Sequence, residues 1–151
     1  MLQHLHGMQM KEDKVEKIVI NGRIPSKKNS RNQIQLPNGR RINIPSKEYK
    51  KWHKNASRQL DEQGVERRSE GSYGVIIKFW MPDNRTADLT NKAESIMDLL
   101  VDNHILEDDC WQNVPFIILE CMGIDRINPR AEVEVPFDLH GLRNKIRSIQ
   151  F

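Results

Sequence analysis

The chain has 151 residues, of which 37% are hydrophobic and 30% are charged, so its length and composition fit one domain with one ordinary core. A mean hydropathy of −0.70, with no apolar run near the roughly 18 residues that a membrane helix needs, excludes a membrane-spanning protein. The sequence opens with no secretory signal pattern, and its two cysteines, Cys110 and Cys121, are too few for a disulfide framework. We therefore expect a cytoplasmic protein with reduced thiols.

The net charge is only +3, but it is distributed unevenly along the sequence. Residues 23–58 carry eleven cations against one acid, a net charge of +10, and residues 83–109 carry eight acids against two cations, a net charge of −6. A basic segment can bind phosphates while an acidic segment binds cations, so this pattern favours an enzyme that acts on a polyanion with bound metal. Two solvated faces that never cooperate would give the same counts.

The first predicted elements are a strand, Glu16–Asn21, and a basic loop, Pro25–Ser30. A β-hairpin follows, because isoleucine and leucine alternate with polar residues on both sides of the turn at 37–39. Its basic tip, Arg40 and Arg41, should be exposed.

A helix capped by Ser46 and running to about Gln63 comes next, with its lysines facing solvent. The pattern then predicts a strand, a second helix and two more strands. Their ranges are Tyr73–Met81, about Leu89–Val101, Val114–Gly123 and Ala131–Val135.

Beyond the last strand, apolar residues at helical spacing alternate with basic ones, which predicts an amphipathic C-terminal helix over 138–151. This helix would pack on the body or on a partner chain. Residues 1–14 are expected to be flexible. The whole chain, 1–151, is predicted to form a single mixed α+β domain with a small β-sheet and two main helices.

The acidic segment carries the candidate chemistry. The second predicted helix has a polar side opposite its apolar arc, and Asp88 lies at the start of this helix. A loop after Leu100 can bring Asp108 and Asp109 back toward Asp88. Carboxylates gathered in this way suit Mg²⁺, which binds through a few carboxylates plus substrate phosphate. Each acid alone also fits a helix cap, a solvated face or a turn. The residues on the polar side are Asn91, Glu94, Ser95, Asp98 and Asp102.

These residues resemble the signature of the RusA-like Holliday junction resolvases. The resemblance rests on Asp88-Leu89-Thr90-Asn91, Asp98-Leu99-Leu100 and Glu107-Asp108-Asp109, together with the Pro25-Ser26-Lys27-Lys28-Asn29 loop and Pro45-Ser46, and it spans roughly 18–135. It implies a RusA-like fold and a Mg²⁺-dependent endonuclease, with Mn²⁺ as a substitute and no small-molecule cofactor. It also implies a homodimer that resolves branched DNA by paired nicks in recombination and repair, in the cytoplasm of a bacterium or a phage-infected cell.

The resemblance also implies roles for individual residues. Metal ligands would be Asp88 and Asp109, with Asp108 beside them. This chain has Thr90 where the family has a second acid and Glu94 where the family has a lysine, so we expect Glu94 to supply the missing carboxylate, with Asp98 assisting catalysis. Expected DNA-binding residues are Lys27, Lys28, Asn29, Arg40, Arg41, Arg85 and Asn91, and Lys27 or Lys28 is the candidate for steadying phosphate charge.

Two alternatives remain open at the level of the sequence. The changes at Thr90 and Glu94 are also compatible with a branched-DNA-binding protein of the same fold with impaired catalysis. A metal-binding scaffold without nucleic acid fits the acids but leaves the basic segment unexplained.

Overall fold

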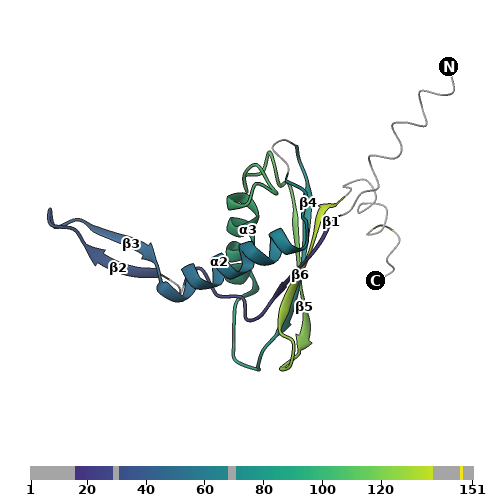
Figure 1. Cartoon of the computed structure of the whole chain (residues 1–151), viewed down its shortest axis with the longest axis horizontal. Coiled ribbons are helices and arrows are strands. Elements are labelled where there is room, and N and C mark those ends of the chain that lie inside the picture. Colours follow the sequence, from purple (N-terminus) through teal and green to yellow (C-terminus); the bar gives the residue numbers. More distant parts are fainter. Residues whose placement is uncertain (1–15, 29–30, 68–70, 138–146, 148–151) are drawn as a thin grey trace, which may run out of the picture.

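The computed structural model describes residues 16–28, 31–67, 71–137 and 147 (Figure 1). The chain forms a mixed α+β domain, and the predicted order of strand, hairpin, helix, strand, helix, strand, strand is confirmed. The predicted C-terminal helix, the N-terminal residues 1–14 and Asn29 lie outside the described residues. The elements are β1 (Glu16–Asn21), β2 (Arg31–Gln35), β3 (Arg41–Pro45), α2 (Lys47–Glu62), β4 (Gly74–Met81), α3 (Leu89–Asp102), β5 (Ile117–Ile124) and β6 (Arg130–Phe137).

The main sheet has the strand order β1-β6-β4-β5. β6 pairs antiparallel with both β1 and β4, whereas β4 and β5 are parallel neighbours. Parallel neighbours cannot be joined by a hairpin, so the chain crosses between them through α3. This crossover places the start of α3 just beyond the end of β4.

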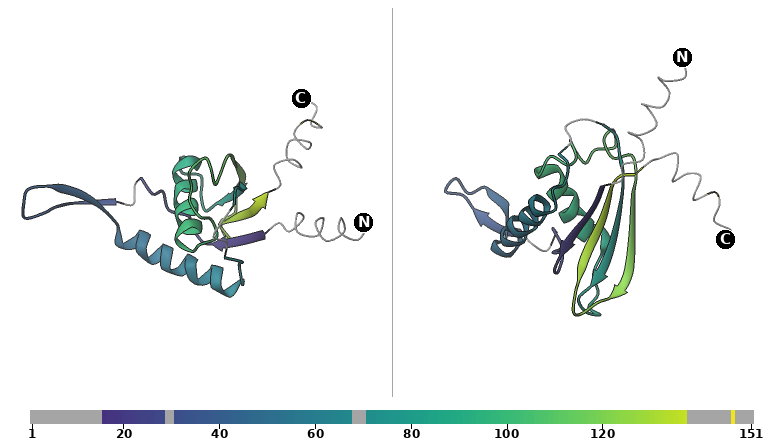
Figure 2. Two further views of the ribbon diagram at one scale, coloured as in Figure 1. Left: turned by 90° about the horizontal axis from the view of Figure 1, so that it is seen from above. Right: turned by 45° about the vertical axis from the view of Figure 1, so that its right-hand side comes forward.

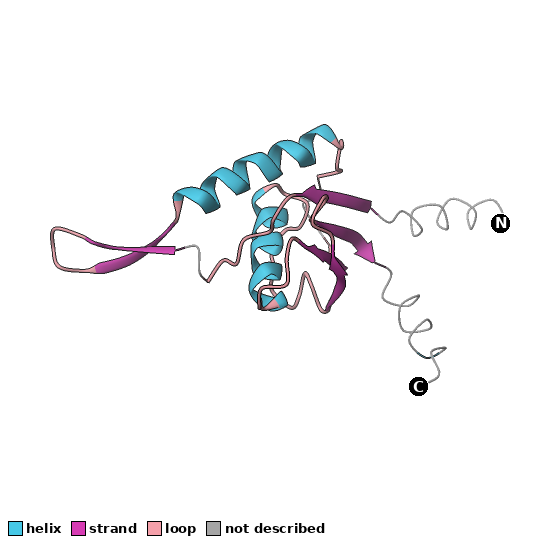
Figure 3. Cartoon of the chain, turned by 90° about the horizontal axis from the view of Figure 1, so that it is seen from below, coloured by secondary structure: helices cyan, strands magenta, loops and turns pink. Residues whose placement is uncertain are grey.

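Both helices cover the same face of the sheet (Figures 2 and 3). Alternation along the strands makes this face apolar, because residues two apart point to the same side. Ile18 and Phe79 from the sheet, Leu60 from α2 and Leu100 from α3 are at most 1% exposed and share one core. Neither of the two described helices is long and apolar enough to span a membrane.

β2 and β3 form a separate two-stranded arm that extends away from the body where α2 begins (Figure 1). Ile34 pairs with Ile42, and the turn is closed by the Leu36 N–H, which donates to the Arg40 carbonyl at 2.8 Å. Gly39 takes a φ of 82°, which favours glycine. The predicted hairpin with an exposed basic tip is therefore confirmed.

One predicted strand boundary is wrong. The sequence pattern placed the start of the fifth strand in chain order at Val114, but β5 begins at Ile117. The Val114 N–H instead donates to the Cys110 carbonyl at 2.8 Å, which closes a turn. Pro115 has no N–H to give to a ladder, so the strand starts only after it.

Candidate active site

Asp88 occupies the N-cap position of α3 without capping it. Its side chain makes no capping hydrogen bond, and its Oδ2 instead accepts from the Asn91 amide at 3.0 Å. The side chain is exposed. A helix N-terminus carries partial positive charge and unpaired N–H groups, which favour an anion. The carboxylate of Asp88 is therefore oriented by Asn91 and remains accessible to a ligand.

The loop after α3 is fastened back onto the helix. His104 takes a φ of 56°, which turns the chain, and the N–H groups of Ile105 and Leu106 both donate to the Leu100 carbonyl. Both side chains are 1% exposed and belong to the core. This anchoring fixes the segment that carries Asp108 and Asp109.

The carboxyls of Asp108 and Asp109 crowd one another. Partial desolvation raises the pKa of Asp109 above its ordinary value, and the neighbouring carboxyls of Asp108 and Asp98 raise it further. The Asp109 N–H donates to Asp108 Oδ1 at 2.8 Å. These three acids thus lie close enough to repel. The sequence led us to expect the returning loop near Asp88, but the acid on α3 that acts on Asp109 is Asp98.

The acids do not form a closed metal cage. In the part of the chain that the structure describes, no three Asp, Glu, His or Cys side chains are grouped as a metal site. Glu94 is exposed on α3, one turn before Asp98. Mg²⁺ keeps several waters and is commonly bound through one or two carboxylates plus substrate phosphate. One or two of these carboxylates would suit such a site, with water and a substrate phosphate as the other ligands.

The loop after β1 lies across α3 and corrects one prediction. Ser95, expected on the polar side opposite the apolar arc, is fully buried under this loop, and its hydroxyl donates to the Pro25 carbonyl at 2.7 Å. The Lys92 ammonium donates to the Ile24 carbonyl at 2.6 Å, and burial lowers the pKa of Lys92. The helical spacing of these residues gave no sign that a loop distant in sequence would cover them.

The same loop brings Lys27 to the polar side of α3. Its Nζ lies 2.5 Å from Asp98 Oδ2. One turn further along, Asp102 Oδ2 lies 2.8 Å from His53 Nε2 on α2. Burial raises the pKa of Tyr49 to about 12, and Asp98 and Asp102 add to that shift. Sequence reasoning missed these pairs because their members come from different elements.

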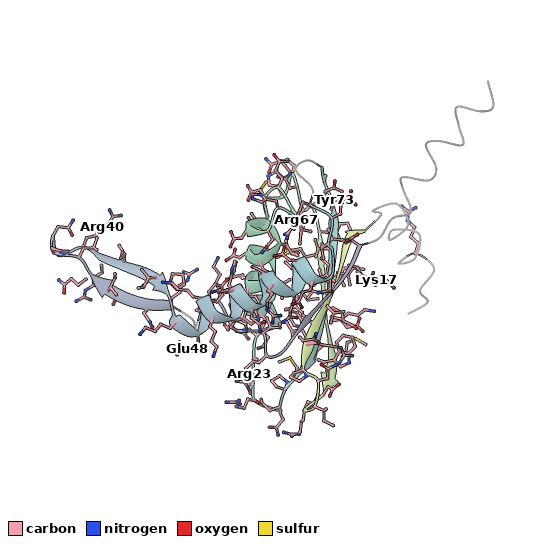
Figure 4. All side chains as sticks on the ribbon, viewed as in Figure 1. Lys17, Arg23, Arg40, Glu48, Arg67 and Tyr73 are labelled. Carbon is pink, nitrogen blue, oxygen red and sulfur yellow. The ribbon has the colours of Figure 1, made fainter. Side chains whose placement is uncertain are left out.

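The predicted DNA-binding residues fall into two groups. Arg40 and Arg41 are exposed at the end of the arm, and Figure 4 shows Arg40 near the tip of the arm. Lys28 is exposed as well. Arg85 is instead engaged by Asp83, with its Nη2 2.8 Å from Asp83 Oδ2.

The model of one protein family, Endodeoxyribonuclease RusA, matches residues 22–136, which is more than half of the chain. No curated protein matches the chain. The matched span contains α3, the Asp108–Asp109 loop and the arm. The resemblance to RusA-like resolvases inferred from the acidic signature is therefore confirmed, and the chain belongs to the RusA endodeoxyribonuclease family.

Proposed function

We propose that this endodeoxyribonuclease resolves Holliday junctions by paired, Mg²⁺-dependent nicks and serves DNA recombination and repair. Membership of the RusA family supports the nuclease activity. The observation that supports the metal dependence is the adjacent pair Asp108 and Asp109, joined by the 2.8 Å hydrogen bond from the Asp109 N–H, in which desolvation first and then the carboxyls of Asp108 and Asp98 raise the pKa of Asp109. Such crowding is unfavourable unless a cation or a proton relieves it, and a nuclease site supplies the cation.

Asp109 is the proposed principal metal ligand, with Asp108 and Glu94 as further carboxylates. Asp88, expected as its partner, lies about 15 Å along α3 from Asp98, the helix acid that acts on Asp109, so Asp88 and Asp109 are not proposed to share one ion within one chain. When bound, Mg²⁺ would lower the pKa of a bound water and stabilise charge on the phosphate. Asn91 holds the carboxylate of Asp88 in place through the 3.0 Å hydrogen bond. The buried contacts of Ile105 and Leu106 hold the loop that carries Asp108 and Asp109.

A basic surface supports DNA as the substrate. It runs from the tip of the arm along α2, with Glu48 as the one acid among residues 31–58 (Figure 4). At roughly 3.3 Å per residue, each five-residue strand of the arm spans about 17 Å. A two-stranded hairpin is marginal in water by itself, so a long arm without a core suits a partner such as DNA. The exposed cations are Arg31, Arg40, Arg41, Lys47, Lys50, Lys51, Lys54 and Arg58, the last of which is paired with Glu62.

Two copies of the chain are proposed to act together, because paired nicks across a four-way junction are most simply made by two symmetry-related sites. β5 is an edge strand of the described sheet. Its Ile117, Met122 and Ile124 are 42%, 42% and 50% exposed. An edge strand with exposed apolar residues favours pairing with another chain. This edge is therefore the proposed dimer contact.

The test compares cleavage of a synthetic four-way junction with cleavage of a linear duplex of the same sequence, in Mg²⁺, in Mn²⁺ and in EDTA. We expect nicks in the junction with either metal and none in EDTA. Equal cutting of both substrates would contradict junction selectivity. Tight, salt-sensitive junction binding without cutting in any divalent ion would favour the catalytically impaired DNA-binding protein instead.

A further inference from the structure

A pocket of about 310 Å³ opens at the base of the arm, between the arm, α2 and α3. Its charged groups are not equivalent. Asp98 is paired with Lys27, and Asp102 with His53. Arg31 has no carboxylate partner among the residues that the structure describes. The lining thus holds two cations and two carboxylates, and Arg31 is the cation that an entering anion can pair with directly. Its lining is Lys27, Arg31, Asn43, Pro45, Tyr49, Asp98 and Asp102.

Lys27 is held at this pocket far more firmly than a surface lysine. Its own N–H donates to the Asn91 carbonyl at 3.3 Å. The two carbonyls of Ile24 and Pro25, just before it, accept from the buried side chains of Lys92 and Ser95. The side chain of Lys27 is still 30% exposed. Its ammonium is thus accessible, and the entropic cost of immobilising its backbone has already been met in folding.

Asp98 is badly placed to share a metal ion with Asp88. The two residues are ten positions apart on one helix, which separates their backbones by about 15 Å along its axis. Its Oδ2 is occupied by the Lys27 ammonium at 2.5 Å. The contacts of Asp98 are those of a residue that orients a lysine.

We propose that the pocket binds a backbone phosphate of the DNA strand near the cleaved bond, with Lys27 and Arg31 as its ligands. Asp98 is then the positioning residue for Lys27 and not a metal ligand. Lys27 donates to the phosphate while one of its remaining N–H groups stays on Asp98, since an ammonium has three donors. This inference rests on the proposed function, because it assigns a subsite to the same DNA substrate.

A double-mutant cycle tests the assignment. Lys27→Ala, Asp98→Asn and the double variant are compared with the parent protein in single-turnover cleavage of a four-way junction. We expect Lys27→Ala to lower the rate by about 10-fold to 100-fold, the range for a lost hydrogen bond to a charged group. Asp98→Asn should lower it less, and the double variant should match Lys27→Ala. Lys27→Arg should restore part of the rate, because it keeps the charge.

The metal requirement separates positioning from ligation. If Asp98 only positions Lys27, the Mg²⁺ concentration for half-maximal cleavage should be the same in Asp98→Asn and the parent. Two results together would make Asp98 a metal ligand and overturn the inference. Asp98→Asn would need more Mg²⁺ for half-maximal cleavage, and the rate losses of the two single variants would multiply in the double variant. Asp61→Asn is the matched control. It makes the same aspartate-to-asparagine change in another ion pair, that of Asp61 with Arg67, which lies at the end of α2 far from the pocket.

Junction binding in EDTA keeps this test independent of catalysis. Without metal, Lys27→Ala and Asp98→Asn should each lower the affinity for the junction. The double variant should bind the junction as tightly as Lys27→Ala does. Tighter binding by Asp98→Asn would show that its carboxylate merely repels the phosphate, which contradicts the inference. A parent protein that binds junctions but never cuts them would refute the proposed function, and the binding cycle would still decide the role of Asp98.

Discussion

Asp109→Asn separates a catalytic carboxylate from a structural one, because it keeps the shape of the side chain and removes its charge. Without metal, the charged form is disfavoured in the folded protein by desolvation and by the carboxyls of Asp108 and Asp98. If the charge serves a metal ion, the substitution should abolish activity while relieving this repulsion. Activity and stability should therefore change in opposite directions.

The expected loss of cleavage is at least about 10²-fold to 10³-fold, the cost of removing one group that stabilises transition-state charge. The stability effect follows from the pKa. The pKa of Asp109 is raised by folding from its ordinary 3.8, so the ionised carboxylate opposes folding above the folded-state pKa, and this penalty vanishes below about pH 3.8. The variant should therefore melt at or above the parent temperature at pH 8 in EDTA, and the difference should shrink as the pH falls toward 4.

Three measurements check this prediction: single-turnover junction cleavage, calorimetric melting in EDTA, and melting with added Mg²⁺. A bound ion stabilises the folded state by mass action, so Mg²⁺ should raise the melting temperature of the parent but not of Asp109→Asn. A folded variant that cuts at the parental rate would refute the site. If Asp109→Asn lowers the melting temperature and leaves cleavage unchanged, the role of Asp109 is structural, as a capping side chain that stabilises the fold by about 1 kcal/mol.

Four further outcomes follow from the structure. Replacing both Arg40 and Arg41 with alanine should make the dependence of log affinity on log salt shallower by up to about two units in anisotropy titrations, and an unchanged slope would place the arm off the DNA. Glu94→Gln should reduce cleavage far less than Asp109→Asn, because Glu94 is a further carboxylate in the proposed site and not its principal ligand; an equal loss would make it a full ligand. Ser95→Ala leaves a part-buried loop carbonyl without its donor and should cost about 0.5–1.5 kcal/mol in urea unfolding, whereas an unchanged midpoint would show that the loop is held by other contacts. Ile124→Glu should shift the mass measured by light scattering from dimer toward monomer, and a dimer that persists would exclude this edge.

The order of elements could be predicted because it depends on local patterns. Alternating apolar residues made β1 and the arm recognisable, and the turn at 37–39 could only close a hairpin. Ser46 was recognised as an N-cap, and it accepts from the Tyr49 N–H at 3.1 Å. The acidic signature of the candidate site was equally local, since Asp88 and Asp109 belong to one short stretch of the sequence.

Only the tertiary structure decided what each helix face contacts. A helical pattern shows which residues share a side of α3, but a loop distant in sequence covers Ser95 and brings Lys27 to Asp98. The parallel pairing of β4 with β5 is likewise a non-local contact that no alternation within either strand specifies. The sequence thus determined which carboxylates are available for chemistry. Folding decided how each is used, because charge pairing depends on distances of a few ångströms between segments far apart in the chain.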